Sequence, residues 1–216
     1  QAGGVHHQEH RRQAAVRLAD KPARRAWLWD WLDGMWVRAE PRLLYPGQTV
    51  LVDPFLSDYA SPINGIGPRR YAGPAITVDK LPPVDVLVIS HNHYDHLDLP
   101  TITALARTGV PFVTSLGVGA HLESWGVPAA RITELDWWQS HRLPGSELTI
   151  TAAPSQHFSG RSLKDRNATL WSSMVIRTAK HSVFFSGDTG LTDQYAEIRR
   201  HFGGGSTKPP FDLVKI

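Results

Sequence analysis

One short stretch, residues 84–100 with the sequence VDVLVISHNHYDHLDLP, constrains the fold more than any other part of the chain. Its apolar run Val86–Ile89 is short and β-branched, which predicts a strand buried on both faces. Asp98 and Pro100 then predict the start of a helix, with apolar residues following at helical spacing. The stretch therefore predicts a strand, a loop and a helix, and open α/β layers place their functional residues on such loops.

The loop after this strand contains five candidate metal ligands within eight residues. They are His91, His93, Asp95, His96 and Asp98. In an extended chain alternate side chains point the same way, so His91, His93 and Asp95 can face one point. Neutral imidazoles and carboxylates suit divalent zinc, manganese or iron, and the chain has no cysteine to compete. The alternative is a solvated polar loop, which explains so dense a cluster less well.

Composition indicates one domain with a substantial core. The chain has 216 residues, 41% of them hydrophobic, and a formal net charge of +3, which is too small to indicate nucleic-acid binding. It shows no apolar run long enough to span a bilayer and no signal-peptide pattern. Without cysteine there is no disulfide framework. We expect a cytoplasmic protein, with peripheral contact at a membrane surface and homodimer formation as open alternatives.

Several motifs resemble the metallo-β-lactamase superfamily. His91-x-His93-x-Asp95-His96 is similar to its metal-binding signature, and the longer string Ser90-His-Asn-His-Tyr-Asp-His-Leu-Asp98 resembles the phospholipases D that hydrolyse N-acyl phosphatidylethanolamine. Further matches within residues 49–216 are Asp53-Pro54, Ala60-Ser61-Pro62, Gly67-Pro68-Arg69-Arg70, Glu134-Leu-Asp-Trp-Trp138, Pro154-Ser-Gln-His157 and Phe184-Phe-Ser-Gly-Asp-Thr-Gly190.

This resemblance implies a fold and a metal centre. The fold is α/β (α+β in some classifications), an αββα four-layer sandwich over residues 49–216, and the centre holds two zinc ions. The implied ligands are His91, His93 and His157 for the first ion, Asp95 and His96 for the second, and Asp188 as the bridge. A hydroxide that bridges two such ions would attack phosphorus, which makes Asp95 and Asp188 the implied catalytic residues.

The resemblance also implies a phospholipid or other phosphodiester substrate, of the N-acyl phosphatidylethanolamine type, cleaved to phosphatidic acid and an N-acylethanolamine. Tyr94 and Arg161 are candidates for binding it, because a guanidinium offers a bidentate fork to a phosphate. A surface salt bridge explains Arg161 equally well. Elsewhere in the superfamily the same centre hydrolyses lactones, thioesters and nucleic acids, so a hydrolase of lactones or other esters is an alternative.

Apolar periodicity predicts the remaining elements. The expected strands cover residues 49–53, 111–114, 131–135, 148–152, 171–177, 182–186 and 211–216, with 171–177 and 182–186 antiparallel. The expected helices cover 116–125 and 194–202. Residues 57–83, rich in Gly and Pro, predict a long loop over the site. Asp53 ends the first of these strands, where it either orients a ligand histidine or closes a turn.

The two ends of the chain depart from the family pattern. Residues 1–48 lack the family's Gly-His-Ala/Ser-Thr turn and carry four of the eight tryptophans between Trp27 and Trp36. We interpret this segment as a helical arm, as an amphipathic helix at a lipid surface, or as sequence that is not the family's native N-terminus. Family members continue to a further histidine, so we expect a missing C-terminal part, a weakened second zinc site and slow turnover. A metal-binding but inactive fragment is the alternative.

Overall fold

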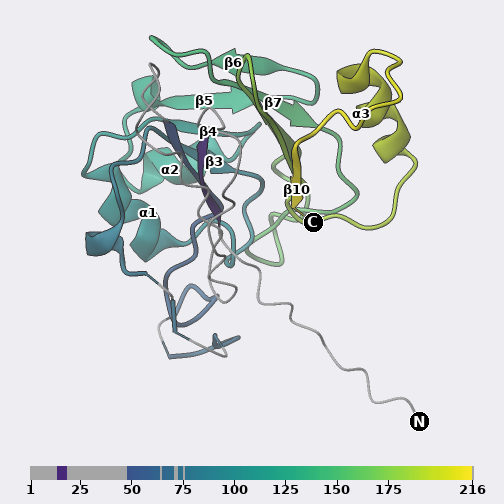
Figure 1. Cartoon of the computed structure of the whole chain (residues 1–216). Helices are drawn as coiled ribbons and strands as arrows, with labels where there is room; N and C mark the ends of the chain where they lie inside the picture. Colours follow the sequence, from purple (N-terminus) through teal and green to yellow (C-terminus); the bar gives the residue numbers. More distant parts are fainter. Residues whose placement is uncertain (1–13, 19–47, 64, 71–72, 75, 216) are drawn as a thin grey trace.

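The computed structural model describes residues 14–18, 48–63, 65–70, 73–74 and 76–215, and within them two five-stranded sheets lie face to face (Figure 1). The first sheet contains, in spatial order, β1 (Ala14–Leu18), β2 (Gln48–Val52), β3 (Val86–Ile89), β4 (Phe112–Ser115) and β5 (Ile132–Leu135). The second contains β10 (Leu213–Lys215), β9 (Ser182–Phe185), β8 (Ser173–Arg177), β7 (Thr149–Ala153) and β6 (Ser140–Arg142). The α-helices are α1 (Leu99–Ala106), α2 (Gly119–Ser124) and α3 (Gln194–Gly203).

The first sheet is parallel from β2 to β5, and β1 pairs antiparallel with β2 at its edge. Parallel neighbours need crossover connections, which α1 supplies between β3 and β4 and α2 supplies between β4 and β5. In the second sheet β10 is parallel to β9, and the other neighbours are antiparallel. Because β2, β3 and β4 run the same way, the loops that follow them emerge at one edge of the molecule.

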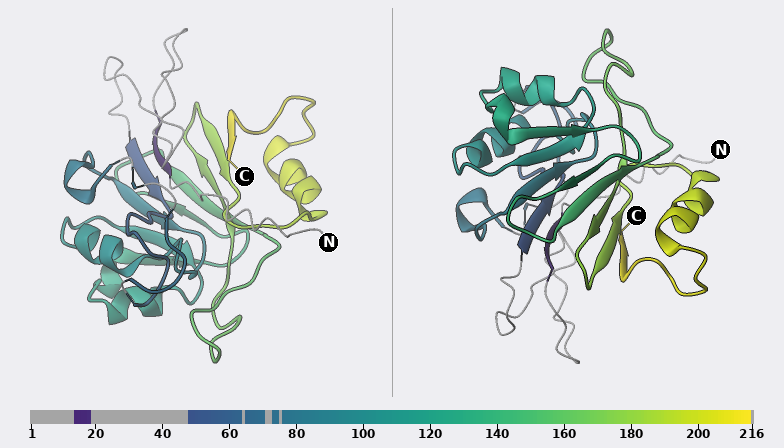
Figure 2. Two further views of the ribbon diagram at one scale, coloured as in Figure 1. Left: turned by 90° about the horizontal axis from the view of Figure 1, so that it is seen from below. Right: turned by 90° about the horizontal axis from the view of Figure 1, so that it is seen from above.

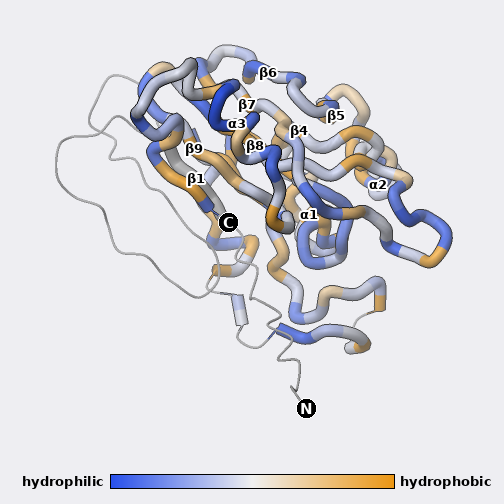
Figure 3. The backbone as a smooth tube through the Cα atoms, turned by 90° about the vertical axis from the view of Figure 1, so that its right-hand side faces the viewer, coloured by the Kyte–Doolittle hydropathy of each residue, from blue (hydrophilic) through white to orange (hydrophobic). Residues whose placement is uncertain are grey.

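Side-chain alternation along each strand builds the layers. In β3, Val86 and Val88 enter the core between the two sheets, whereas Leu87 and Ile89 pack in the core beneath α1 and α2. In β8, Val175 points outward and packs with Ile198 of α3. Figure 2 shows α1 and α2 on one outer face and α3 on the other, and Figure 3 shows orange, apolar stretches along the strands. The expected αββα four-layer sandwich is therefore confirmed.

Most predicted elements are present, including the antiparallel pair β8 and β9. The helix expected over 116–125 is shorter, because Gly117 has a left-handed φ of 85° and α2 begins only at Gly119. The strand β1 lies inside the segment where no strand was expected, and β6 was also missed. The predicted helix around Trp27–Trp36 lies outside the described residues. Among those described, no helix has the length and apolar character needed to cross a membrane.

Candidate metal centre

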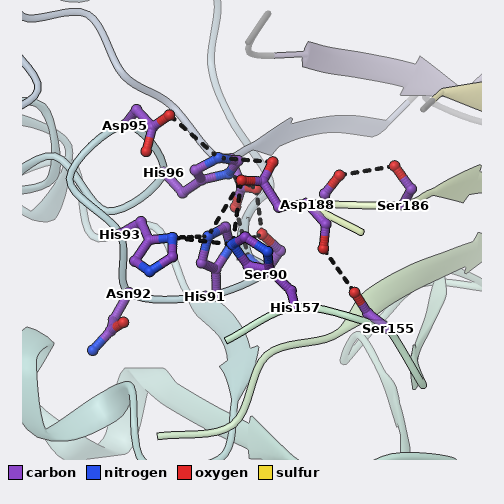
Figure 4. A network of polar contacts seen from close by, with 12 residues as sticks. Ser90, His91, Asn92, His93, Asp95, His96, Ser155, His157, Ser186 and Asp188 are labelled. Atoms are coloured by element: carbon purple, nitrogen blue, oxygen red, sulfur yellow. Dashed lines mark hydrogen bonds and ion pairs between the residues drawn. The ribbon is translucent and has the colours of Figure 1, made fainter. Parts of the chain in front are cut away.

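Three strand ends bring the predicted ligands together (Figure 4). The loop after β3 carries four of them, the segment after β7 carries His157, and the turn after β9 carries Asp188. Each of these strands is buried along its whole length or nearly so, which fixes where its last residue lies. The rigid sheets therefore determine where the polar side chains of the following loops converge.

The first group of ligand atoms is built from three imidazoles and one carboxylate. His93 Nδ1 lies 2.9 Å from His91 Nε2 and 3.1 Å from His157 Nε2. Asp188 Oδ2 lies 3.4 Å from His157 Nε2 and 3.8 Å from His91 Nε2. Ligand atoms that surround zinc as a tetrahedron, 2.0–2.1 Å from the ion, are about 3.3 Å apart. The spacing and the chemistry of this donor set fit a divalent cation.

A second group adjoins the first through Asp188. Its other oxygen, Oδ1, lies 3.2 Å from His96 Nε2, and Asp95 Oδ2 lies 3.8 Å from the same nitrogen. Asp188 thus offers one carboxylate oxygen to each group, the arrangement expected of a bridging ligand. The Asp188 and His96 side chains are 8% and 4% exposed, but that of Asp95 is 33% exposed, so solvent reaches the second group from the Asp95 side.

A buried hydrogen-bond chain orients two of the histidines. Asp53 Oδ2 lies 2.6 Å from His96 Nδ1 and accepts a hydrogen bond from the Ser90 hydroxyl, whose oxygen is 2.9 Å from His91 Nδ1. Because a carboxylate only accepts, we assign the hydrogen of His96 to Nδ1. The Ser90 hydroxyl donates to Asp53 and so accepts from His91 Nδ1. Both Nε2 atoms then keep their lone pairs for a cation, and Asp53 is the orienting acceptor rather than a simple turn residue.

A glycine permits the close approach of β9 to β3. Gly187 has a left-handed φ of 58°, and a Cβ placed there would lie 2.9 Å from Ser90 Cβ and 3.0 Å from the Ser172 carbonyl oxygen. On the other side of Asp188, the Ser155 hydroxyl donates a 2.7 Å hydrogen bond to the Asp188 carbonyl oxygen. The backbone at Asp188 is therefore held by the close packing at Gly187 and by the Ser155 hydroxyl.

Asp98, one of the five candidates in this loop, is not part of the cluster and occupies the N-cap position of α1, where the sequence predicted the start of a helix. Its Oδ2 accepts hydrogen bonds from the hydroxyls of Thr101 and of Ser57, the latter at 2.7 Å. Burial raises the pKa of the Asp98 carboxyl above its ordinary value, against the effect of these hydrogen bonds. Because α1 begins at the next residue, the Asp98 side chain turns toward α1 and toward the loop at Ser57, and its hydrogen bonds join these two segments.

The two residues predicted to bind substrate, Tyr94 and Arg161, contact each other. The Tyr94 hydroxyl donates a 2.7 Å hydrogen bond to the Arg161 carbonyl oxygen, and Arg161 Nη1 donates to the carbonyl oxygens of Asn92 and Leu97 at 2.9 and 2.8 Å. These contacts join Arg161 to the loop that carries the candidate ligands. The role of Tyr94 and Arg161 toward substrate stays a prediction, whereas Ser90 and Asn92 take part in the architecture of the site without having been singled out in the sequence.

Comparison with known proteins assigns the family. Residues 48–207 match the Beta-lactamase superfamily domain. An αββα sandwich whose strand ends carry a His/Asp cluster of this kind agrees with that match. The chain belongs to the metallo-β-lactamase superfamily.

Similar proteins include one that is uncharacterized and one that is named as an enzyme. The chain is 48% identical over 171 residues to an uncharacterized protein of Mycobacterium tuberculosis, covering 79% of this chain and 44% of that protein. It is 33% identical over 178 residues to N-acyl-phosphatidylethanolamine-hydrolyzing phospholipase D 1 of Caenorhabditis elegans, covering 79% of this chain and 48% of that enzyme. The chain therefore spans less than half the length of these curated relatives.

Solved structures share the fold at lower identity. A possible metal-dependent hydrolase from Veillonella parvula superposes with a TM-score of 0.56 at 20% identity, covering 72% of this chain and 62% of that one. CmlA, a diiron β-hydroxylase from Streptomyces venezuelae, gives a TM-score of 0.56 at 23% identity, covering 79% of this chain and 31% of that one. Because one of these proteins is named for iron, the fold does not by itself determine the metal.

Proposed function

We propose that the chain forms the metal centre of a zinc-dependent phosphodiesterase that acts on N-acyl phosphatidylethanolamine-type phospholipids. The observation that carries this proposal is the convergence of three imidazole nitrogens on the Asp188 carboxylate. His93 Nδ1 lies 2.9 Å from His91 Nε2 and 3.1 Å from His157 Nε2, and Asp188 also faces His96. The relative from Caenorhabditis elegans, named for hydrolysis of this lipid, supports the substrate class.

The two groups of side chains would each hold one cation. His91, His93 and His157, with Asp188, suit the first. Asp95 and His96 suit the second, because His96 Nε2 lies 3.8 Å from Asp95 Oδ2 and 3.2 Å from Asp188 Oδ1. Bound divalent cations would supply Lewis-acid stabilisation of phosphoryl oxygens and would activate water at neutral pH. The all-nitrogen side of the first group favours zinc, which accepts imidazole and carboxylate ligands in fourfold coordination.

The two carboxylates nearest the centre have different roles in this proposal. Asp188 is only 8% exposed, and its two carboxylate oxygens hold the two groups of ligands at a fixed distance from each other. Asp95, 33% exposed, is the acidic side chain that an entering water reaches, and its oxygen can accept a hydrogen bond from that water and hold it for attack. Substituting either carboxylate should therefore abolish turnover by different routes.

An apolar side chain lies beside the ligands. The Phe158 side chain is 44% exposed, and its ring lies 4.6 Å from the His93 ring and 4.7 Å from the His157 ring. An exposed aromatic ring next to a polar centre suits a substrate that joins a phosphate to hydrocarbon chains, because the ring can pack against the chain while the phosphate enters the centre. This placement supports a lipid over a small polar phosphodiester.

A substrate panel tests the proposal. The zinc-loaded chain would be incubated with N-acyl phosphatidylethanolamine in mixed micelles, with a homoserine-type lactone and with a thioester, alongside Asp188→Asn as the matched inactive variant. We expect N-acylethanolamine and phosphatidic acid from the lipid with the parent chain alone. Hydrolysis of the lactone or thioester without cleavage of the lipid would contradict the proposal, as would lipid cleavage that Asp188→Asn retains.

A further inference from the structure

Arg161 reaches from the loop that follows His157 to the loop that carries the other histidines. Its Nη1 donates to the carbonyl oxygens of Asn92 at 2.9 Å and Leu97 at 2.8 Å. Asn92 lies between two of the ligands and Leu97 follows the last histidine of the loop, so the two acceptors bracket the turn of residues 92–97. One guanidinium nitrogen thus links both ends of the turn that presents His93, Asp95 and His96.

The surroundings of Arg161 hold its guanidinium in place. The carbon Cζ lies 4.0 Å from the centre of the Tyr94 ring and 5.2 Å from that of the Trp125 ring. The Tyr94 hydroxyl bonds back to the Arg161 carbonyl oxygen at 2.7 Å, and the Asn92 side chain accepts a 2.8 Å hydrogen bond from the Gly160 backbone. The Arg161 backbone amide is in turn bound by the Asp165 carboxylate at 3.0 Å. These hydrogen bonds form a closed network between two loops that are far apart in the sequence, since Tyr94 and Arg161 are 67 residues apart.

Burial lowers the pKa of the Arg161 guanidinium, while Tyr94, Asp98 and Asp165 raise it. An arginine keeps its charge at neutral pH even so, since its ordinary pKa lies far above that range. The side chain is half-buried and donates to carbonyl oxygens that belong to the ligand loop itself. Both hydrogen bonds use Nη1, so this nitrogen is tied to the two ends of the ligand loop.

We infer that Arg161 is a positioning residue, whose guanidinium sets the width of the turn 92–97 and thereby the metal affinity and geometry of His93, Asp95 and His96. The inference rests on the metal centre of the proposed function, and it assigns Arg161 a role other than the phosphate clamp predicted from its position in the sequence. Residues that orient metal ligands without binding the metal themselves typically change metal affinity about 10–100-fold when they are mutated.

The test compares zinc affinity, by competition with a chromophoric chelator, and the visible ligand-field spectrum of the cobalt-substituted protein. The variants are Arg161→Met, Arg161→Lys and Tyr94→Phe. Arg131→Met is the matched control, because Arg131 Nη1 also donates to a backbone carbonyl, that of Ala106 at 2.8 Å, at the end of α1. Thermal unfolding of each metal-free variant verifies that it folds.

We expect Arg161→Met to weaken zinc binding by about 10–100-fold and to change the cobalt spectrum, with Arg161→Lys restoring part of both and Arg131→Met matching the parent chain. If Arg161→Met does not fold, Tyr94→Phe, which removes only the hydroxyl bond to Arg161, carries the test with a smaller loss. Parent-like zinc affinity and cobalt spectrum in the folded Arg161 variants would overturn the inference. Zinc affinity is measured without substrate, so a parent chain that binds zinc but cleaves no phosphodiester would contradict the proposed function alone.

Discussion

Replacing Asp53 by asparagine tests whether the hydrogen-bond chain behind the ligands sets their tautomers. Three donors face the Asp53 carboxylate: the Ser90 amide at 2.7 Å, the Ser90 hydroxyl, and His96 Nδ1 at 2.6 Å. An asparagine has the same shape but only one acceptor oxygen, so in either orientation its NH₂ group faces a donor. If it faces His96 Nδ1, the imidazole is driven to carry its hydrogen on Nε2, where the lone pair for a cation would otherwise lie.

The size of the effect follows from this mismatch. A buried donor left without its acceptor costs about 1–3 kcal/mol, and Asp53 is only 2% exposed. At about 1.4 kcal/mol per factor of ten, the expected loss of zinc affinity is roughly 5- to 150-fold. The loss should fall on the ion that His96 would hold and, through Ser90, reach the ion that His91 would hold.

Competition with a chelator at fixed pH measures both affinities, and Asp79→Asn, at a fully exposed position on the 3₁₀ helix Val78–Lys80, serves as the control. Zinc affinities for Asp53→Asn within a factor of two of the parent chain would refute the reasoning, because the tautomers would then be set by something other than Asp53.

Three further predictions concern the fold that holds the centre. Gly187→Ala should lower the free energy of unfolding in urea by at least about 1 kcal/mol more than Gly145→Ala, because both positions have a positive φ but a Cβ at Gly145 meets nothing within 4 Å; equal losses would contradict the close contact with Ser90. Saturation with zinc at 100 times its dissociation constant should stabilise the chain by about 2.7 kcal/mol, and a thermal unfolding curve unmoved by chelation would argue against a specific site. Leu87→Ala, at a fully buried position in β3, should cost about 2–5 kcal/mol, whereas a loss under 1 kcal/mol would place Leu87 outside a packed core.

The sequence predicted the parts of the fold whose signal is local. A β-branched run such as Val86–Ile89 is buried on both faces and leaves few alternatives to a central strand. The ligand loop was equally readable, because His91, His93 and His96 lie within six residues. The position of β6 was not, since its residues Ser140–Arg142 are polar and partly exposed and carry no apolar alternation.

What the sequence could not supply is contact between distant residues. The hydroxyl of Ser90 reaches an acceptor 37 residues away, and nothing in the residue itself distinguishes it from a solvated serine. For Arg161 the sequence left a phosphate contact and a surface salt bridge open, and no local pattern indicated that it donates to two backbone carbonyls of the ligand loop. Asp98 has the chemistry of a ligand, but the start of α1 turns it away from the centre.

The central claim is that the side chains at three strand ends converge on divalent cations. Anomalous X-ray diffraction from crystals grown with zinc measures this directly. The structure predicts a peak about 2.0–2.2 Å from His91 Nε2, His93 Nδ1 and His157 Nε2, with Asp188 as the fourth ligand. Crystals that show ordered His91 and His157 side chains and no anomalous peak between them would contradict it.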